Sequence, residues 1–339
     1  MNQSVSLVAD IGGTNIRLGS VAADRKPTKI RSYRCADFPG LEAAIDQYQL
    51  DAEVASFDQA VVAVANPITG DKAELTNSDW EFSISAVKLR YQLSEFKVIN
   101  DFTALALSLP LLAADELAEL YVPATGEHPK QATKAVLGPG TGLGVSGLIY
   151  CELAMSAANS DAVAPEVESA LWQPLQGEGG HVTIAPHNDR EWAIVKTILT
   201  DADVTDHVSA ERLLSGPGLV RLAQAIARLD QVSIDVDSPA EVVAKGIAGD
   251  CPVCAETLQV FCGQLGSLSA DLALSLGAAG GVYIGGGVTP HLSDYLKTSD
   301  FVKRYLAKGR MEKLLRSMPV YMIQSENPAL LGATQLIKP

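Results

Sequence analysis

Short apolar runs that end at glycine-rich turns recur along this chain. The first turn contains Gly12 and Gly13 and lies between residues 7–11, which are apolar except for Asp10, and the alternating residues 16–18. Two β-rich segments joined by Gly-Gly predict a hairpin, because paired glycines accept the positive φ that a tight connection demands. With no Cβ atoms in the way, backbone N–H groups and the Thr14 hydroxyl can come close to a phosphate. The turn thus predicts a phosphate-binding loop, with a plain surface hairpin as the alternative.

The same pattern returns at residues 134–150, where two apolar runs flank a glycine-rich turn with a threonine at Thr141. Such a repeat indicates two similar half-domains, whose hairpins would face each other across a cleft and grip a polyphosphate from both sides. The second turn is not a Walker A loop, because no Gly-Lys-Ser/Thr follows it. Gly142, Gly144 and Gly147 match G-x-G-x-x-G, but a predicted strand follows them rather than a helix, so we treat the match as chance.

The remaining pattern alternates strands and helices, which predicts an α/β fold with a mixed sheet. We expect a buried strand at 60–65, another strand at 96–100, and helices at 41–48, 103–109, 188–199, 217–226, 258–276 and 326–338. Residues 159–172 are acidic and aperiodic, which predicts a loop. Residues 272–290 are uncharged and long enough to suggest a membrane span, but six glycines there favour a helix end, a strand and a glycine turn.

Composition narrows the function. The 339 residues, 47% of them hydrophobic and 19% charged, describe a globular protein long enough for two domains, and no Pro/Ser-rich linker separates them. The net charge of −14 argues against nucleic acid and anionic membranes as partners. No signal peptide is recognised, so we expect a cytoplasmic protein with free thiols. Cys251 and Cys254 form a lone C-x-x-C, and without a second pair or a nearby histidine it does not favour a redox or zinc role.

A set of motifs in this order resembles the bacterial glucokinases, in the hexokinase branch of the sugar kinase, Hsp70 and actin superfamily. The motifs occupy residues 10–17, 66–70, 75–78, 98–101, 138–144, 177–181, 209–218 and 281–287. The resemblance implies a two-domain actin-like ATPase (ribonuclease H-like) fold with an interdomain cleft. It implies a small domain of residues 1–111 plus 325–339, which the C-terminal helix rejoins, and a large domain of residues 112–324. It also implies ATP and Mg²⁺ as cofactors, D-glucose as substrate and a homodimer.

The resemblance assigns the nucleotide to the glycine-rich turns. The residues implied are Asp10, Gly12, Gly13, Thr14, Asn15, Gly138, Gly140, Thr141, Gly142, Gly285 and Gly286. Gly285 and Gly286 follow a short strand, where they would let the backbone approach the adenosine; a bare strand-to-helix turn is the alternative. Asp10 is placed to hold Mg²⁺ through its water shell, since Mg²⁺ prefers carboxylate oxygen and keeps its waters.

Asp101 is the candidate catalytic base. It follows a predicted strand and precedes a helix, and ligands of open α/β sheets bind beyond the carboxyl ends of strands. A sugar hydroxyl is a poor nucleophile, and a positioned carboxylate can accept its proton. From the residues alone, Asp101 could instead cap the next helix. The resemblance favours the base.

Five polar side chains complete the expected sugar site: Asn77, Asn100, Glu178, His181 and Glu211, with Asp101 beside them. Carboxylates and amides can read vicinal hydroxyls, each of which is both donor and acceptor. Glu178 and His181 are separated by two glycines, which predicts an extended loop that points both into a cleft. Glu211 opens a helix, where it could instead complement the helix dipole.

Three other classes remain as alternatives. Sugar-binding repressors need an N-terminal helix-turn-helix, but the first strand begins near Val5, and their kinase relatives carry a cysteine-rich zinc motif that residues 182–190 lack. An actin-like filament or chaperone ATPase would not need Asn-Asp together with Glu-x-x-His. A kinase for fructose or mannose stays open. The sequence therefore predicts an ATP-dependent glucose 6-phosphotransferase, with another hexose kinase or a non-catalytic ATPase as the alternatives.

Overall fold

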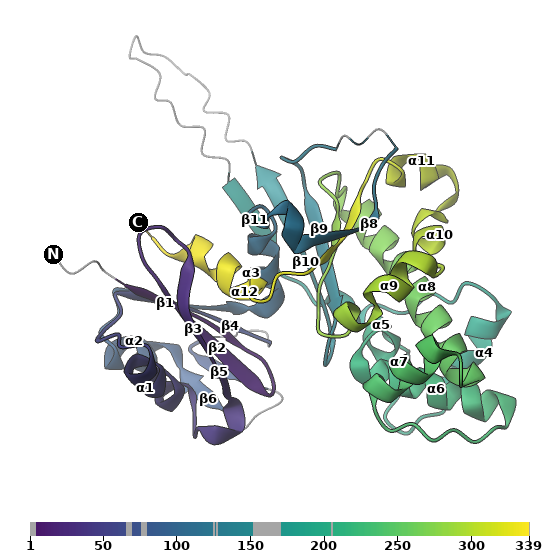
Figure 1. The fold of residues 1–339 in the computed structure, drawn as a ribbon, viewed down its shortest axis with the longest axis horizontal. Helices are drawn as coiled ribbons and strands as arrows, with labels where there is room; N and C mark the ends of the chain where they lie inside the picture. The colour runs from purple at the N-terminus through teal and green to yellow at the C-terminus, as the bar shows by residue number, and fades with distance from the viewer. Residues whose placement is uncertain are drawn as a thin grey trace, which may run out of the picture.

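The computed structural model describes residues 5–65, 70–75, 80–124, 126, 128–151, 171–204 and 206–338 (Figure 1). Two large sheets dominate it. The first has the order β3-β2-β1-β4-β7. Its strands are β1 (Ser6–Ile11), β2 (Asn15–Val21), β3 (Pro27–Arg34), β4 (Gln59–Val64) and β7 (Glu95–Asn100). β1 runs antiparallel to β2 and parallel to β4, which is parallel to β7. The predicted first hairpin and both predicted strands are confirmed, and β4 is fully buried as expected.

Alternation along β1 and β4 gives the first sheet two buried faces. Leu7 and its neighbours two residues apart pack on α1 (Leu41–Asp51) and α2 (Ile84–Arg90). Val8 lies on the other face, against α3 (Asp101–Ser108) and α12 (Pro328–Ala333). A small hairpin of β5 (Lys72–Glu74) and β6 (Glu81–Ser83) adjoins the first of these cores.

The second sheet repeats the topology of the first. Its order is β11-β10-β9-β12-β13-β8, from β8 (Leu117–Tyr121), β9 (Lys134–Pro139), β10 (Leu143–Cys151), β11 (Leu171–Leu175), β12 (Val282–Ile284) and β13 (Val320–Ile323). β9 is antiparallel to β10 and parallel to β12, which is parallel to β13. A hairpin followed by two parallel strands thus occurs in both halves, which confirms the repeat.

Helices cover the second sheet on the side away from the first half (Figure 1). They are α4 (Asp189–Ile198), α5 (Ala210–Leu213), α6 (Gly216–Asp230), α7 (Pro239–Ala248), α8 (Pro252–Leu276), α9 (Ser293–Thr298), α10 (Phe301–Leu306) and α11 (Glu312–Leu315). Short 3₁₀ turns lie at Cys35–Asp37, Ala114–Glu116, Gly179–His181, Thr289–Leu292, Gly309–Met311 and Thr334–Leu336. α8 begins six residues before the predicted start, because Pro252 suits a first helical position.

α3 joins the two halves. Ala104 packs into the core of the first sheet, whereas Leu105 and Leu107 pack into a core with Val136 of the second. α12 crosses α3 so closely that a Cβ on Gly332 would lie 1.8 Å from the Ala104 carbonyl oxygen. Figure 1 shows both helices in the middle of the molecule. Since Asp101 is the first residue of α3, it lies where the halves meet.

Two predicted segments need correction. The C-terminal helix predicted at 326–338 is shorter, because Asn327 precedes a proline and is not helical, and a 3₁₀ turn replaces the last helical residues. The loop predicted at 159–172 ends in strand: Trp172 pairs with Tyr150 in the β10–β11 ladder, and residues 152–170 lie outside the described part. All five cysteines are free, as expected. In the described part of the chain, we find no helix with the length and apolarity to cross a bilayer.

A buried ion pair ties α4 to α10. Asn188 caps α4, but Glu191 does not reciprocate as a capping box requires. Its carboxylate instead accepts from the backbone N–H of His187 and from Arg304 Nη1, at 2.7 and 2.6 Å. Glu191 and Arg304 are 4% and 6% exposed. Each charge therefore depends on the other.

Replacing Arg304 by Met is expected to lower the free energy of unfolding by about 3–5 kcal/mol, because it leaves the Glu191 carboxylate buried and uncompensated. Lys303→Met, at the next position, removes only an exposed pair with Asp300 and should cost less than about 1 kcal/mol. Urea unfolding of both variants measures the difference. Equal effects would show that the buried pair contributes no more than a surface pair.

Candidate active site

The turn between β1 and β2 presents open backbone. Its ends are held by two hydrogen bonds, from Gly12 N–H to the Asn15 carbonyl at 2.9 Å and from Cys35 N–H to the Thr14 carbonyl at 2.8 Å. Neither Gly12 nor Gly13 has a positive φ, so that part of the hairpin prediction is wrong. The support from Cys35 outside the hairpin holds the turn in ordinary backbone conformations. The missing Cβ atoms thus leave space above the turn without setting its handedness.

The second and third glycine turns pack on each other through their backbones. A Cβ on Gly138 would lie 2.6 Å from the carbonyl carbon of Gly285, and one on Gly286 would lie 2.2 Å from the Pro139 carbonyl oxygen. Gly286 also has a positive φ of 84°. By contrast, a Cβ on Gly140 would meet nothing closer than 3.8 Å. Gly138 and Gly286 therefore shape the contact, whereas Gly140 faces open space.

An apolar cavity of about 640 Å³ adjoins these turns. Gly140 and Thr141 line one side, and Pro239, Val243 and Ala244 of α7 line another. The sequence analysis missed the contribution of α7. Its Ser-Pro-x-Glu start was readable as a helix start, but nothing in the sequence brings that helix beside the second glycine turn, about a hundred residues away. Such a cavity suits a flat apolar ring system whose phosphates reach the turns.

Asp101 lies at the end of β7, in a cluster of acids. Asn100 is the N-cap of α3 and accepts from the backbone N–H of Phe102 and Thr103, at 2.9 and 3.2 Å. The capping that the sequence analysis weighed for Asp101 is therefore done mainly by Asn100. One carboxylate oxygen of Asp101 accepts from Phe102 N–H at 2.8 Å.

The surroundings of Asp101 raise its pKa to about 7, through burial first and then repulsion from Asp10 and Glu178. Burial also raises the pKa of Asp10, against the lowering effect of Arg17, whose Nη1 lies 3.5 Å from its Oδ2. These interactions place Asp10, near the end of β1, in one site with Asp101 and Glu178. A carboxyl that titrates near neutral pH is suited to accept a proton there.

Glu178 precedes a 3₁₀ turn and His181 ends it, instead of the extended loop that we predicted. Gly180 packs so tightly that a Cβ would lie 2.1 Å from the Leu143 carbonyl oxygen, and this contact curls the segment against β10. A bridge between Thr183 and Ser209 then places the turn beside α5.

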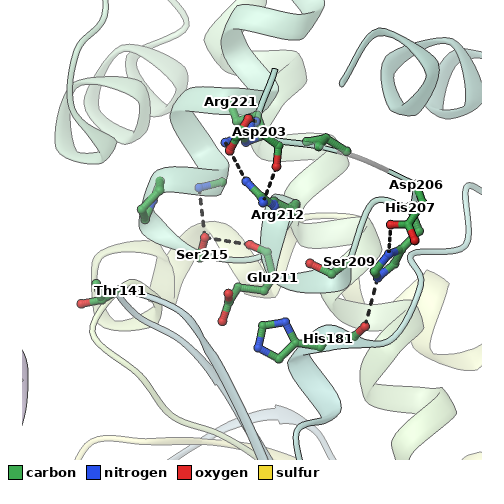
Figure 2. A pocket seen from close by; sticks show the side chains of 13 residues that line it. Thr141, His181, Asp203, Asp206, His207, Ser209, Glu211, Arg212, Ser215 and Arg221 are labelled. Atoms are coloured by element: carbon green, nitrogen blue, oxygen red, sulfur yellow. Dashed lines mark hydrogen bonds and ion pairs between the residues drawn. The ribbon is translucent and has the colours of Figure 1, made fainter. Parts of the chain in front are cut away.

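Figure 2 shows His181 and Glu211 from these two segments pointing into one cavity, with Thr141 of the second glycine turn across from them. The cavity measures about 320 Å³. Glu211 also accepts from the backbone N–H of Leu143 at 2.8 Å. It therefore supports the second glycine turn, a contact that the sequence analysis missed because the partner is a backbone group.

Of the two remaining predicted sugar-site residues, Asn77 and Asn100, the structure describes only Asn100. Asn77 lies outside the described residues, as does the 66–69 part of the Asn-Pro-Ile-Thr-Gly motif. The side-chain oxygen of Asn100 is engaged in capping α3, which leaves its amide NH₂ to donate to a ligand.

Among the described residues, no group of three or more His, Cys, Asp or Glu side chains could hold a metal ion by itself. A divalent ion here would need ligands from a bound nucleotide and water.

The two repeated halves, with a hairpin turn in each facing the region where α3 joins them, define the two-domain actin-like ATPase fold. The family described as Glucokinase matches residues 7–339. A glucokinase of Aromatoleum aromaticum is 44% identical over 332 residues, which cover 96% of this chain and 92% of that one. The chain belongs to the glucokinase family.

Solved glucokinase structures share the fold of this chain. The glucokinase of an Antarctic psychrotroph superposes with a TM-score of 0.81 at 32% identity, covering 97% of each chain. A ROK family glucokinase from Streptomyces griseus, in complex with glucose and AMPPNP, has a TM-score of 0.61 at 20% identity and covers 98% of this chain and 99% of that one. At that identity the likeness shows the fold alone.

Proposed function

We propose that this enzyme transfers the γ-phosphoryl group of ATP to the 6-hydroxyl of D-glucose through Asp101 as general base. The observation that carries this proposal is the position of Asp101, at the start of α3 between the two halves, with its pKa raised to about 7 beside Asp10 and Glu178. Both glucose and an ATP analogue occur in the Streptomyces griseus relative, which supports the choice of substrates.

The nucleotide is assigned to the glycine turns and the cavity beside α7. The first turn would supply Gly12, Gly13, Thr14 and Asn15, the second Gly138, Gly140, Thr141 and Gly142, and the third Gly285 and Gly286. The open space above Gly140 and the apolar wall of α7 support this assignment. Asp10 would hold Mg²⁺ through water, since its carboxylate faces the same site and the described residues offer no all-protein metal cage. The ion would neutralise charge on the transferring phosphoryl group.

Glucose is assigned to Asn77, Asn100, Asp101, Glu178, His181 and Glu211. The convergence of His181 and Glu211 in one cavity supports this part of the set (Figure 2). In the reaction, the Asp101 carboxylate accepts the proton of the 6-hydroxyl while the hydroxyl oxygen forms its bond to the γ-phosphorus. Glu178 and Glu211 hold other hydroxyls, which fixes the attacking oxygen in line with the bond that breaks.

The organisation expected from the sequence belongs to the same proposal. We assign residues 1–111 and 325–339 to a small domain and 112–324 to a large one, and the packing of α12 on the first sheet supports the return of the chain end. A homodimer and a cytoplasmic location are inferred from the family resemblance.

Activity should depend on pH through Asp101. Because the base must be unprotonated, kcat/KM is expected to fall about tenfold for each pH unit below 7 and to level off above it. A pH profile at constant ionic strength, with glucose well below KM, measures the free enzyme. A profile that is flat between pH 5 and 7 would contradict the raised pKa of the base.

The function is tested by a coupled assay with purified protein, ATP and a panel of hexoses. We expect glucose to give the highest kcat/KM, with glucose 6-phosphate as product. Fructose or mannose as the preferred acceptor would favour the other hexose kinases. ATP hydrolysis that does not depend on any sugar would favour the non-catalytic ATPase class. Replacing ATP by ADP or polyphosphate in the same assay defines the phosphoryl donor.

A further inference from the structure

The first turn of α8 holds two cysteines in direct contact. Cys251 is the N-cap, and its sulfur accepts from the Cys254 backbone N–H at 3.4 Å. Pro252 occupies the first helical position. Cys251 is partly exposed, whereas Cys254 is fully buried. Sulfur is a weak acceptor and a poor cap compared with a serine hydroxyl, so helix capping alone does not explain a cysteine at this position.

We propose that Cys251 and Cys254 form a redox-active dithiol that low-molecular-weight disulfides oxidise, and that its oxidation weakens nucleotide binding through α7. The sequence pattern alone argued against a redox role because supporting context was missing. The structure supplies that context, because Cys251 lies at a helix N-terminus, is partly exposed and contacts the buried Cys254.

The pKa values of the two thiols are shifted in opposite directions. Burial acts to raise the pKa of Cys251, but hydrogen bonds from the Cys254 backbone and thiol outweigh it, with a smaller effect from Lys245, and the pKa is lowered. Burial, and then the Cys251 sulfur, raise the pKa of Cys254 to about 12. The partly exposed Cys251 is thus the attacking thiolate, and the buried Cys254 is the resolving thiol.

The chemistry balances with one disulfide, R–S–S–R, as oxidant. The Cys251 thiolate attacks one sulfur of R–S–S–R, which forms a mixed disulfide and releases RS⁻. Cys254 gives its proton to solvent, and its thiolate attacks the Cys251 sulfur and displaces the second RS⁻. The two protein thiols together lose two electrons, and R–S–S–R gains them and is reduced to two thiols.

α7 connects this pair to the cavity beside the glycine turns. A Cβ on Gly246 would lie 2.8 Å from the Cys254 carbonyl oxygen and 2.7 Å from a Leu258 methyl group, so α7 rests directly on the first turn of α8. On the same helix, Val243 and Ala244 line the cavity of about 640 Å³. Drawing the Cys254 sulfur out toward Cys251 moves the turn on which α7 rests. This second part of the inference relies on the proposed nucleotide site.

The test equilibrates the full chain in glutathione buffers of rising oxidised fraction, with intact mass measured after alkylation. We expect oxidation to remove two alkylation sites, both in the peptide that contains residues 251–254, and dithiothreitol to restore them. The KM for ATP should rise at least about fivefold on oxidation, the low end of usual couplings between sites, while the KM for glucose stays within about twofold.

Matched variants separate the explanations. Cys251→Ser keeps a helix cap and should fold normally, but its ATP KM should no longer respond to oxidised glutathione. Cys151→Ser removes the other partly exposed thiol and should respond like the unsubstituted chain. If no Cys251–Cys254 disulfide forms in fully oxidised buffer, the dithiol proposal is overturned. A disulfide that leaves the ATP KM of an active kinase unchanged overturns the coupling, whereas a reduced protein without kinase activity overturns the proposed function instead.

Discussion

Replacing Asp101 by Asn is expected to lower kcat by at least about 10²-fold while glucose affinity stays within about tenfold. Asparagine has nearly the same shape and can still hydrogen-bond to a sugar, but its amide cannot take a proton from the 6-hydroxyl at neutral pH. A coupled assay measures kcat, and calorimetric titration measures glucose binding. Turnover close to that of the unsubstituted enzyme would remove Asp101 from the role of base.

The chain offers a matched control for this variant. Asn188 and Asp189 start α4 as Asn100 and Asp101 start α3, with an asparagine cap followed by an acid, but Asp189 is exposed and away from the site. Asp189→Asn should therefore leave kcat unchanged. A similar loss in both variants would mean that the acid acts only on the helix start.

Replacing Asp101 by Asn should lower activity but raise the stability of the folded protein above neutral pH. The pKa of Asp101 is raised from its ordinary 3.8 to about 7, so the folded state holds a proton that the unfolded chain gives up. Ionised Asp101 thus destabilises the fold as pH rises from about 4 through 7. At pH 8, Asp101→Asn should raise Tm, whereas below pH 4 the two proteins should melt alike. A lower Tm for the variant at pH 8 would contradict the raised pKa.

Much of the fold could be predicted from local patterns in the sequence. The hairpin around Gly12 and the strand before Asp101 are readable because apolar runs and turn residues are local signals. The repeat at 134–150 correctly indicated a second half of the same design. Errors lie at boundaries set by distant contacts. The C-terminal helix stops short although its pattern continues, and the segment at Gly179 curls because Gly180 meets the Leu143 carbonyl.

Candidate site residues could be proposed from the sequence, but the interactions between them could not. Asp101, Glu178 and His181 could be proposed because their motifs resemble those of the glucokinases, and because they follow a predicted strand or lie in a glycine-rich segment. The hydrogen bond from the Leu143 N–H to Glu211 and the position of α7 beside the cavity could not be predicted, since both involve segments far apart in the sequence. The roles of Asn100 as cap and Asp101 as titrating acid also separate only when the hydrogen bonds are known.

Gly140→Val is expected to raise the KM for ATP about 10- to 100-fold, which corresponds to the 1–3 kcal/mol that overpacking usually costs. A side chain at Gly140 points into the space beside Thr141 where the phosphates are assigned. The free protein has room for it, since the nearest atom to a Cβ there is Gly287 N at 3.8 Å. Stability and the KM for glucose should therefore change little. ATP titrations at saturating glucose and thermal melts measure the two effects.

Gly138→Val separates a blocked nucleotide from a damaged turn. Two residues away on the same hairpin, its Cβ would strike the backbone of Gly285 at 2.6 Å, which no rotamer change relieves. That variant should lose stability before any ligand is added, whereas Gly140→Val should melt like the unsubstituted protein and fail only toward ATP. Because both positions belong to the same glycine turn, a shared loss of stability would assign both glycines to folding. An unchanged ATP KM in a folded Gly140→Val variant would place the phosphates elsewhere.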